Sequence, residues 1–100
     1  MIRFQRSGKT KPGKFLDGIR FAKEIAEYCN ATYAPISVQV YAELFGNVDT
    51  IHWHIDYKDL ATIEGVNTKL LTDQGYWAIV NKGMEFFVEG SFHDCLISSV

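Results

Sequence analysis

Two histidines, His52 and His54, stand one residue apart in a segment whose polar and apolar side chains alternate. Because successive side chains of a β-strand point to opposite faces, both imidazoles are predicted to lie on one face, about 6.5–7 Å apart by Cα. Imidazole titrates near neutral pH and also binds divalent metals, so the pair suits general base catalysis or metal ligation. The polar face carries Thr50, His52, His54 and Asp56, and the apolar face carries Ile51, Trp53, Ile55 and Tyr57.

The preceding strand supplies two further candidates. Residues 36–45 predict a second strand, residues 46–49 a turn, and residues 50–57 a third strand. A turn centred on residues 47–48 pairs Ala42 with Trp53 on the apolar face. On the polar face it places Glu43 opposite His52, and Tyr41 opposite His54. We therefore take four residues as catalytic candidates, namely His52, His54, Glu43 and Tyr41.

Three interpretations of this polar face stay open. In the first, a histidine acts as general base and Glu43 orients it. In the second, His52, His54 and Glu43 bind a divalent metal such as zinc or non-haem iron. In the third, the same side chains form hydrogen bonds across a dimer interface, since a fold does not determine a function. No other cofactor is expected.

The remaining elements predict the fold. We expect a strand over residues 1–6, a loop over 7–13, and a helix over 14–33 with a continuous apolar stripe. A second helix is predicted from residue 58 to 71, a further helical stretch from 76 through 87 with a stop at Gly90, and a last strand over 91–99. The order β-α-β-β-α(α)-β is that of the ferredoxin-like α+β fold, with a four-stranded antiparallel sheet and helices on one face. The chain, residues 1–100, is predicted to be one domain.

An aromatic-lined pocket between the helices and the sheet is a second candidate site. Trp53, Tyr57, Tyr76 and Trp77 are expected to line it, together with Phe15, Ile19 and Phe87. Pockets of this composition hold flat organic ligands. The alternative is an ordinary aromatic core.

Part of the chain resembles the NIPSNAP-like branch of the dimeric α+β barrel superfamily, which also includes antibiotic-biosynthesis-monooxygenase-like proteins. The resemblance rests on the segment from His52 to Ala61, followed by Leu70, Asp73, Tyr76-Trp77 and Lys82-Gly83. It implies a homodimer whose two sheets face each other, with helices outside. Relatives include quinone-forming monooxygenases, haem-degrading enzymes and stress-responsive barrels. The haem-degrading relatives use an Asn–Trp–His set, and the first predicted strand of this chain has no asparagine.

Composition limits the partners. The net charge is −2, which gives no global indication of binding to nucleic acid or to a membrane, although seven of the ten basic residues fall in the first 23. Gly8-Lys9-Thr10 is not a P-loop, because the position that requires the first glycine holds Arg3. Two distant cysteines predict no disulfide scaffold, and we expect a soluble cytoplasmic homodimer.

Together these features predict a protein that binds a small, flat or hydrophobic organic molecule. One interpretation is that it also transforms this molecule, as a cofactor-independent oxygenase or an isomerase-like enzyme with histidine or tyrosine as base. The alternatives are a non-catalytic stress-response or interaction barrel whose polar face is a dimer interface, and the metal site described above.

Overall fold

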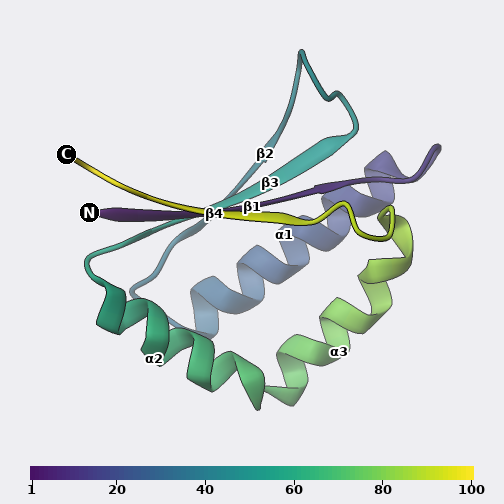
Figure 1. Ribbon diagram of the computed structural model, residues 1–100. Coiled ribbons are helices and arrows are strands. Elements are labelled where there is room, and N and C mark those ends of the chain that lie inside the picture. Colours follow the sequence, from purple (N-terminus) through teal and green to yellow (C-terminus); the bar gives the residue numbers. More distant parts are fainter.

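The computed structural model describes residues 1–100 and has one sheet with helices on one side of it (Figure 1). The element order confirms the predicted ferredoxin-like α+β fold. The strands are β1 (Ile2–Lys9), β2 (Val38–Ala42), β3 (Thr50–Tyr57) and β4 (His93–Ser98). The helices are α1 (Phe15–Thr32), α2 (Leu60–Leu71) and α3 (Gln74–Gly83), and a 3-10 turn, η1 (Met84–Phe86), follows α3.

The four strands are antiparallel and run in the order β2-β3-β1-β4, so β1 and β3 are the central pair, as in the ferredoxin-like topology. Ile2 pairs with Tyr57 and Lys9 with Thr50 at the two ends of that pair. This places Ile51, Trp53 and the other apolar residues of β3 on the face toward the helices. The histidines of β3 therefore lie on the face that no helix covers (Figure 1).

Helix α1 forms most of the core with β3. Its buried residues recur at three- and four-residue steps and include Phe21, Ala22, Ile25 and Cys29. The indole N–H of Trp53 donates a hydrogen bond to the backbone carbonyl of Ala22 at 3.2 Å. This bond satisfies the one polar group of a residue that is otherwise buried among aromatic rings.

Helices α2 and α3 lie on the same side as α1 but follow the sheet less closely, and Ile63 is the only buried residue of α2 (Figure 1). Both helices begin at an aspartate whose side chain accepts a backbone N–H: Asp59 from Thr62 and Asp73 from Tyr76. Asp73 also accepts hydrogen bonds from the hydroxyls of Tyr28 and Tyr33. The junction between α2 and α3 is thus fixed to the end of α1.

The predicted register of the β2–β3 hairpin was wrong by two residues. Trp53 pairs with Val40 rather than Ala42, and His52 pairs with Tyr41 rather than Glu43. The reason is that residues 43–49 form a longer connection than a two-residue turn. The Glu43 carboxylate accepts the backbone N–H of Asn47 at 2.8 Å, which ends the ladder early. A shift of two keeps every side chain on its predicted face.

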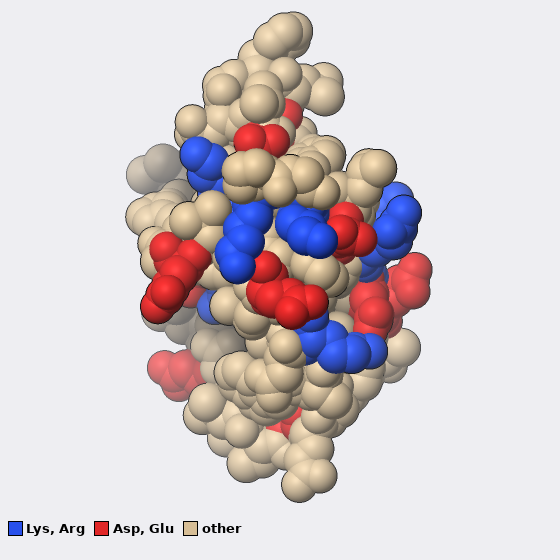
Figure 2. All heavy atoms as spheres, turned by 90° about the vertical axis from the view of Figure 1, so that its right-hand side faces the viewer, with Lys and Arg blue, Asp and Glu red and all other residues tan.

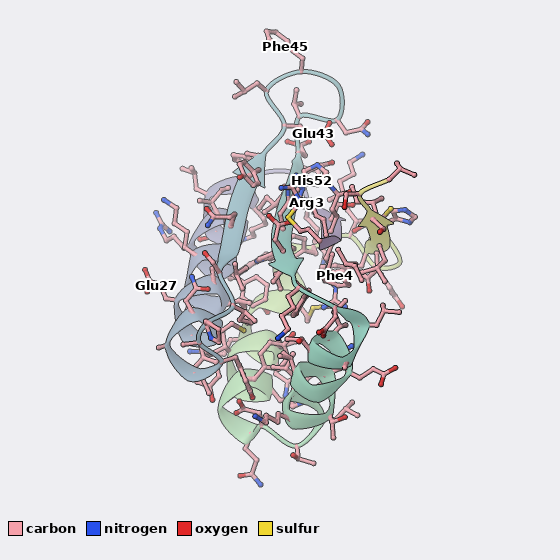
Figure 3. All side chains as sticks on the ribbon, turned by 90° about the vertical axis from the view of Figure 1, so that its left-hand side faces the viewer. Arg3, Phe4, Glu27, Glu43, Phe45 and His52 are labelled. Carbon is pink, nitrogen blue, oxygen red and sulfur yellow. The ribbon has the colours of Figure 1, made fainter.

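The connection exposes apolar residues that a longer ladder would have paired. Leu44 is 83% and Phe45 90% exposed, and Phe45 stands at the tip of the hairpin (Figure 3). Strand β2 is accordingly shorter than the predicted 36–45. Strand β1 is longer than predicted and runs to Lys9, so only residues 10–14 connect it to α1.

The third helix ends at Gly83, before the predicted stop at Gly90. Gly83 lies so close to α1 that an added Cβ would stand 2.0 Å from the ring of Phe21. The chain then passes through η1, and Phe87 becomes extended and buried in the core. Gly90, with φ of 77°, lies in the turn before β4.

Surface charge is mixed on the side of the molecule shown in Figure 2, where basic and acidic side chains alternate. Lys14 and Arg20, which belong to the basic N-terminal stretch, both contact Asp17. These two basic side chains therefore lie beside an acidic group. No helix is both long and apolar enough to pass through a membrane.

Candidate functional site

The sheet has two faces with different candidate sites. The open face, which no helix covers, carries the side chains that alternate with the core positions. From β2 and β3 these are Gln39, Tyr41, His52, His54 and Asp56, and from β1 and β4 they are Arg3, Gln5, Ser7, His93, Cys95 and Ile97. All four predicted catalytic residues lie on this side.

Glu43 and His52 are in contact, as predicted, although they are not direct partners in the ladder. Glu43 Oε1 lies 2.8 Å from His52 Nε2, below the hairpin tip (Figure 3). This bond and the backbone N–H of Asn47 lower the pKa of Glu43. An ionised Glu43 can therefore orient the imidazole of His52, which is the geometry of a general base with an orienting carboxylate.

His54 lies against Tyr41, with ring centroids 4.8 Å apart, and against His52 at 5.9 Å. Burial, followed by the positive charge of Arg3 and the neighbouring His52, lowers its pKa. His54 is consequently neutral at physiological pH. Tyr41 is 51% exposed and makes no side-chain hydrogen bond within the chain. Tyr41 and His54 are thus available to a partner or a ligand.

No group of three or more His, Cys, Asp or Glu side chains is arranged to hold a metal ion. The carboxylate of Glu43 is committed to His52 and to the backbone of the connection, and Asp56 is held by Arg3 through two bonds of 2.8 and 3.1 Å. The geometry therefore gives no support to the divalent-metal interpretation of His52, His54 and Glu43.

A cavity of about 500 Å³ lies on the other face, between the sheet and the three helices. All four predicted pocket residues, Trp53, Tyr57, Tyr76 and Trp77, line it. Phe15, Ile19 and Phe87 do not line it and belong to the core beside it. The lining also includes Phe4, Phe21, Ile25, Cys29, Val38, Ile55, Ile63, Leu70, Leu71, Val80, Met84 and Phe92.

Two of the 18 lining residues are strongly polar, Arg6 and Asn67, and sequence reasoning missed both. Arg6 binds Asp94 of β4 through two parallel bonds, Nε to Oδ1 at 2.7 Å and Nη2 to Oδ2 at 2.9 Å. A signal was present: in β1 the alternation of Ile2 and Phe4 puts Arg6 on the apolar face. An arginine at a core-facing strand position is unusual and requires a partner.

The ionisable groups around the cavity are poor bases at neutral pH. Burial raises the pKa of the Tyr57 and Tyr76 hydroxyls, and it raises that of the Cys29 thiol to about 11. The hydrogen bond with Asp94 raises the pKa of Arg6. Each of these groups keeps its proton at pH 7, so the cavity offers hydrogen-bond donors and apolar contact rather than a proton acceptor.

The two candidate sites do not meet. Trp53 points into the cavity, and its neighbours His52 and His54 point to the opposite side of the same sheet. A histidine of this chain therefore does not contact a molecule bound in its own cavity. The predicted combination of a pocket ligand and a histidine base is not formed within one protomer.

Comparison with known proteins gives a family. One family model, described as a family of unknown function, DUF6039, matches residues 2–97. This chain belongs to the DUF6039 family. No curated protein matches the sequence.

Solved structures share the DUF6039 fold. A NIPSNAP domain protein from Burkholderia xenovorans superposes with a TM-score of 0.83 at 12% identity, covering 100% of this chain and 95% of that one. A NIPSNAP family protein from Agrobacterium tumefaciens gives 0.81 at 15% identity, covering 99% and 92%. A protein described as an antibiotic biosynthesis monooxygenase gives 0.74 at 10% identity, covering 100% and 99%. The resemblance expected from the sequence is confirmed for the fold.

Proposed function

We propose that this protein binds a small, flat and mainly apolar organic molecule in the cavity between its sheet and its helices. The observation that supports this most is the cavity itself: about 500 Å³, with 16 of 18 lining residues hydrophobic. This volume and lining match those of pockets that enclose small organic ligands. Trp53 and Trp77 supply flat surfaces from different elements, the strand β3 and the helix α3.

The proposal is binding rather than base catalysis. An oxygenase or isomerase that removes a proton from its substrate requires an acceptor beside the ligand. The tyrosines of the cavity hold their protons at neutral pH, and the histidines lie on the other face. The likeness to the monooxygenase structure, at 10% identity, supports the fold alone.

Native mass spectrometry of freshly purified protein tests the proposal first. We expect a small organic molecule of stoichiometric amount, or, for protein purified empty, stabilisation against heat by naphthalene as a flat apolar probe. Val80→Trp fills the cavity from α3 and is expected to weaken naphthalene binding at least about tenfold without loss of folding. Val48→Trp, at the exposed hairpin connection outside the cavity, is the matched control. Equal binding by wild type and Val80→Trp, or no binding by wild type, would contradict the proposal.

We also propose that two copies associate through the open faces of their sheets. No helix covers this face, and four of its polar side chains are already paired within the chain as Arg3–Asp56 and Glu43–His52. Internal pairing lowers the cost of covering the face, because a paired charge loses less on desolvation than an isolated one. The dimer of this fold class implied by the sequence resemblance has the same arrangement.

Sedimentation of wild type and of two lysine variants tests the dimer. Gln5→Lys places a cation on the central strand of the open face, where a two-fold axis brings like charges together. We expect it to weaken dimerisation at least about tenfold. Thr68→Lys adds the same charge on exposed α2 and is expected to leave the dimer unchanged. A wild-type monomer, or equal effects of both variants, would overturn the proposal.

A further inference from the structure

The Arg6–Asp94 pair is the feature of the cavity that apolar packing does not explain. It joins β1 to β4 on the helix side of the sheet, and Arg6 is the only charged residue of the lining. Arg6 and Asp94 are 40% and 48% exposed in their side chains, so the pair stands at the boundary between cavity and solvent. A molecule that fills the cavity therefore meets Arg6, whose partner Asp94 lies just outside the lining.

The guanidinium of Arg6 has donors left for a ligand. Arginine carries five N–H groups, and the bonds from Nε and Nη2 to Asp94 use two. The other three are not used by Asp94, and the guanidinium also interacts with the Tyr76 hydroxyl beside it. The guanidinium itself lies over the ring of Phe4, with Cζ 5.4 Å from the ring centroid. Because the carboxylate and the ring fix the guanidinium plane, the remaining N–H groups are oriented before any ligand arrives.

Further polar groups line the same cavity as Arg6. Tyr57 and Tyr76 line the same cavity, and the charge of Arg6 acts on both hydroxyls. The Tyr57 hydroxyl makes no hydrogen bond within the chain, and Asn67 is the other strongly polar residue of the lining. The polar lining of the cavity thus has more donors than acceptors, because Arg6 only donates, and this suits an oxygen with free lone pairs.

The charge of Asp94 determines which kind of ligand oxygen can bind beside Arg6. The pair is neutral as a whole, so a second carboxylate beside Arg6 would place two negative charges around one guanidinium. A neutral carbonyl oxygen can accept the remaining N–H groups with no such repulsion. Resting on the proposed binding function, we propose that the ligand is a flat apolar molecule ending in a neutral carbonyl group, and that Arg6 and Asp94 together select it over the corresponding acid.

Three naphthalenes substituted at one ring position test this selection, since they differ in one small group: ethylnaphthalene, acetylnaphthalene and naphthoate. In calorimetric titrations of wild-type protein we expect acetylnaphthalene to bind about tenfold more tightly than either of the others. Arg6→Met keeps the apolar stem and removes the donors. It should abolish the preference for acetylnaphthalene while ethylnaphthalene binds as before.

Asp94→Asn provides a second variant with the opposite effect. It leaves Arg6 charged and without its counter-ion, so naphthoate should bind about tenfold more tightly than it does to wild type. Arg3→Met and Asp56→Asn are the matched controls, because Arg3 and Asp56 form the same two-bond pair on the open face. Both controls are expected to bind all three probes as wild type does, with folding of each variant checked by circular dichroism.

The outcomes separate this inference from the binding proposal beneath it. If ethylnaphthalene binds wild type as tightly as acetylnaphthalene, or naphthoate binds most tightly, the selection is wrong and the apolar cavity remains a binding site. The same conclusion follows if Arg6→Met still prefers acetylnaphthalene, or if naphthoate binds Asp94→Asn no more tightly than wild type. It also follows if the controls Arg3→Met and Asp56→Asn change probe binding as much as the variants of Arg6 and Asp94 do. If none of the three probes binds wild type, the binding proposal itself fails.

Discussion

The two faces of the sheet carry similar arginine–aspartate pairs in different surroundings. Each carries an arginine of β1 paired with an aspartate through two bonds: Arg3 with Asp56 on the open face, and Arg6 with Asp94 on the cavity face. Around the first pair lie histidines and polar side chains. Around the second lie aromatic rings and a cavity of about 500 Å³. The same interaction is therefore part of a polar surface in one place and the polar end of an apolar site in the other.

This difference follows from which elements cover each face. All three helices lie on one side, and α2 and α3 stand far enough from the sheet to leave the cavity open (Figure 1). The open face receives no element of its own chain, so its side chains pair with one another. Because alternate side chains of β3 point to opposite faces, the sequence neighbours Trp53 and His54 belong to separate sites.

The largest expected contrast between the faces is in stability. Trp53→Ala removes a buried indole that packs against Phe21 and Phe87, and it should lower the free energy of unfolding by about 3–5 kcal/mol. The loss should be the same at every protein concentration, because it arises within the chain. Urea titrations at two concentrations, roughly a hundredfold apart, measure it.

His54→Ala is the neighbouring control on the open face. We expect a much smaller loss, and one that changes with protein concentration, because the side chain lies in the proposed dimer contact. If His54→Ala were as destabilising as Trp53→Ala at both concentrations, the division into a packed face and an interface face would be wrong.

Alternation predicted the faces well because it depends on local geometry alone. The assignment of Trp53 and Tyr57 to the helix side, and of His52 and His54 to the open side, required only a period of two. The strand order was predictable from the element order. Even the error of two in the β2–β3 register left both faces intact, and Glu43 still reaches His52.

Distances set by tertiary structure were not predictable in this way. The register depended on the Glu43 side chain accepting the Asn47 N–H, a contact that turn propensities do not describe. The cavity depends on how far α2 stands from the sheet, and the partner of Arg6 comes from a strand 88 positions later in the chain. Arg6 itself was detectable, since its place beside Phe4 conflicts with an apolar face.

A smaller effect is expected in how the free energy of unfolding depends on pH. Burial and the charges of Arg3 and His52 hold the pKa of His54 below its usual 6.5, so the unfolded chain binds more protons in this range. Stability should therefore be complete above pH 6.5 and fall as the pH drops through that value toward the lower pKa of the folded state. Urea midpoints between pH 7.5 and about 5 should decline in wild type and stay level in His54→Asn.

The carboxylates give an internal reference for that experiment. Glu43 and Asp56 have lowered pKa values, through His52 and Arg3 respectively, so their contribution is lost only as the pH falls below about 4.5. Wild type and His54→Asn should decline alike in that lower range. Equal slopes between pH 7.5 and 5 would show instead that His54 is solvated like a free histidine.

The smallest expected change in stability comes from removing one carboxylate of either arginine pair. Both pairs are about half exposed, with side-chain exposures of 39% and 44% for Arg3 and Asp56, and 40% and 48% for Arg6 and Asp94. Exposed ion pairs contribute little to folding, so Asp94→Asn should cost less than about 1 kcal/mol, and Asp56→Asn should be indistinguishable from wild type in urea titrations. Similar stabilities would mean that any difference in probe binding between the two variants reflects the place of Arg6 at the cavity rather than a loss of structure. A loss of several kcal/mol for Asp94→Asn would instead make the pair a structural tie between β1 and β4, and its effect on binding would then follow from a displaced edge strand.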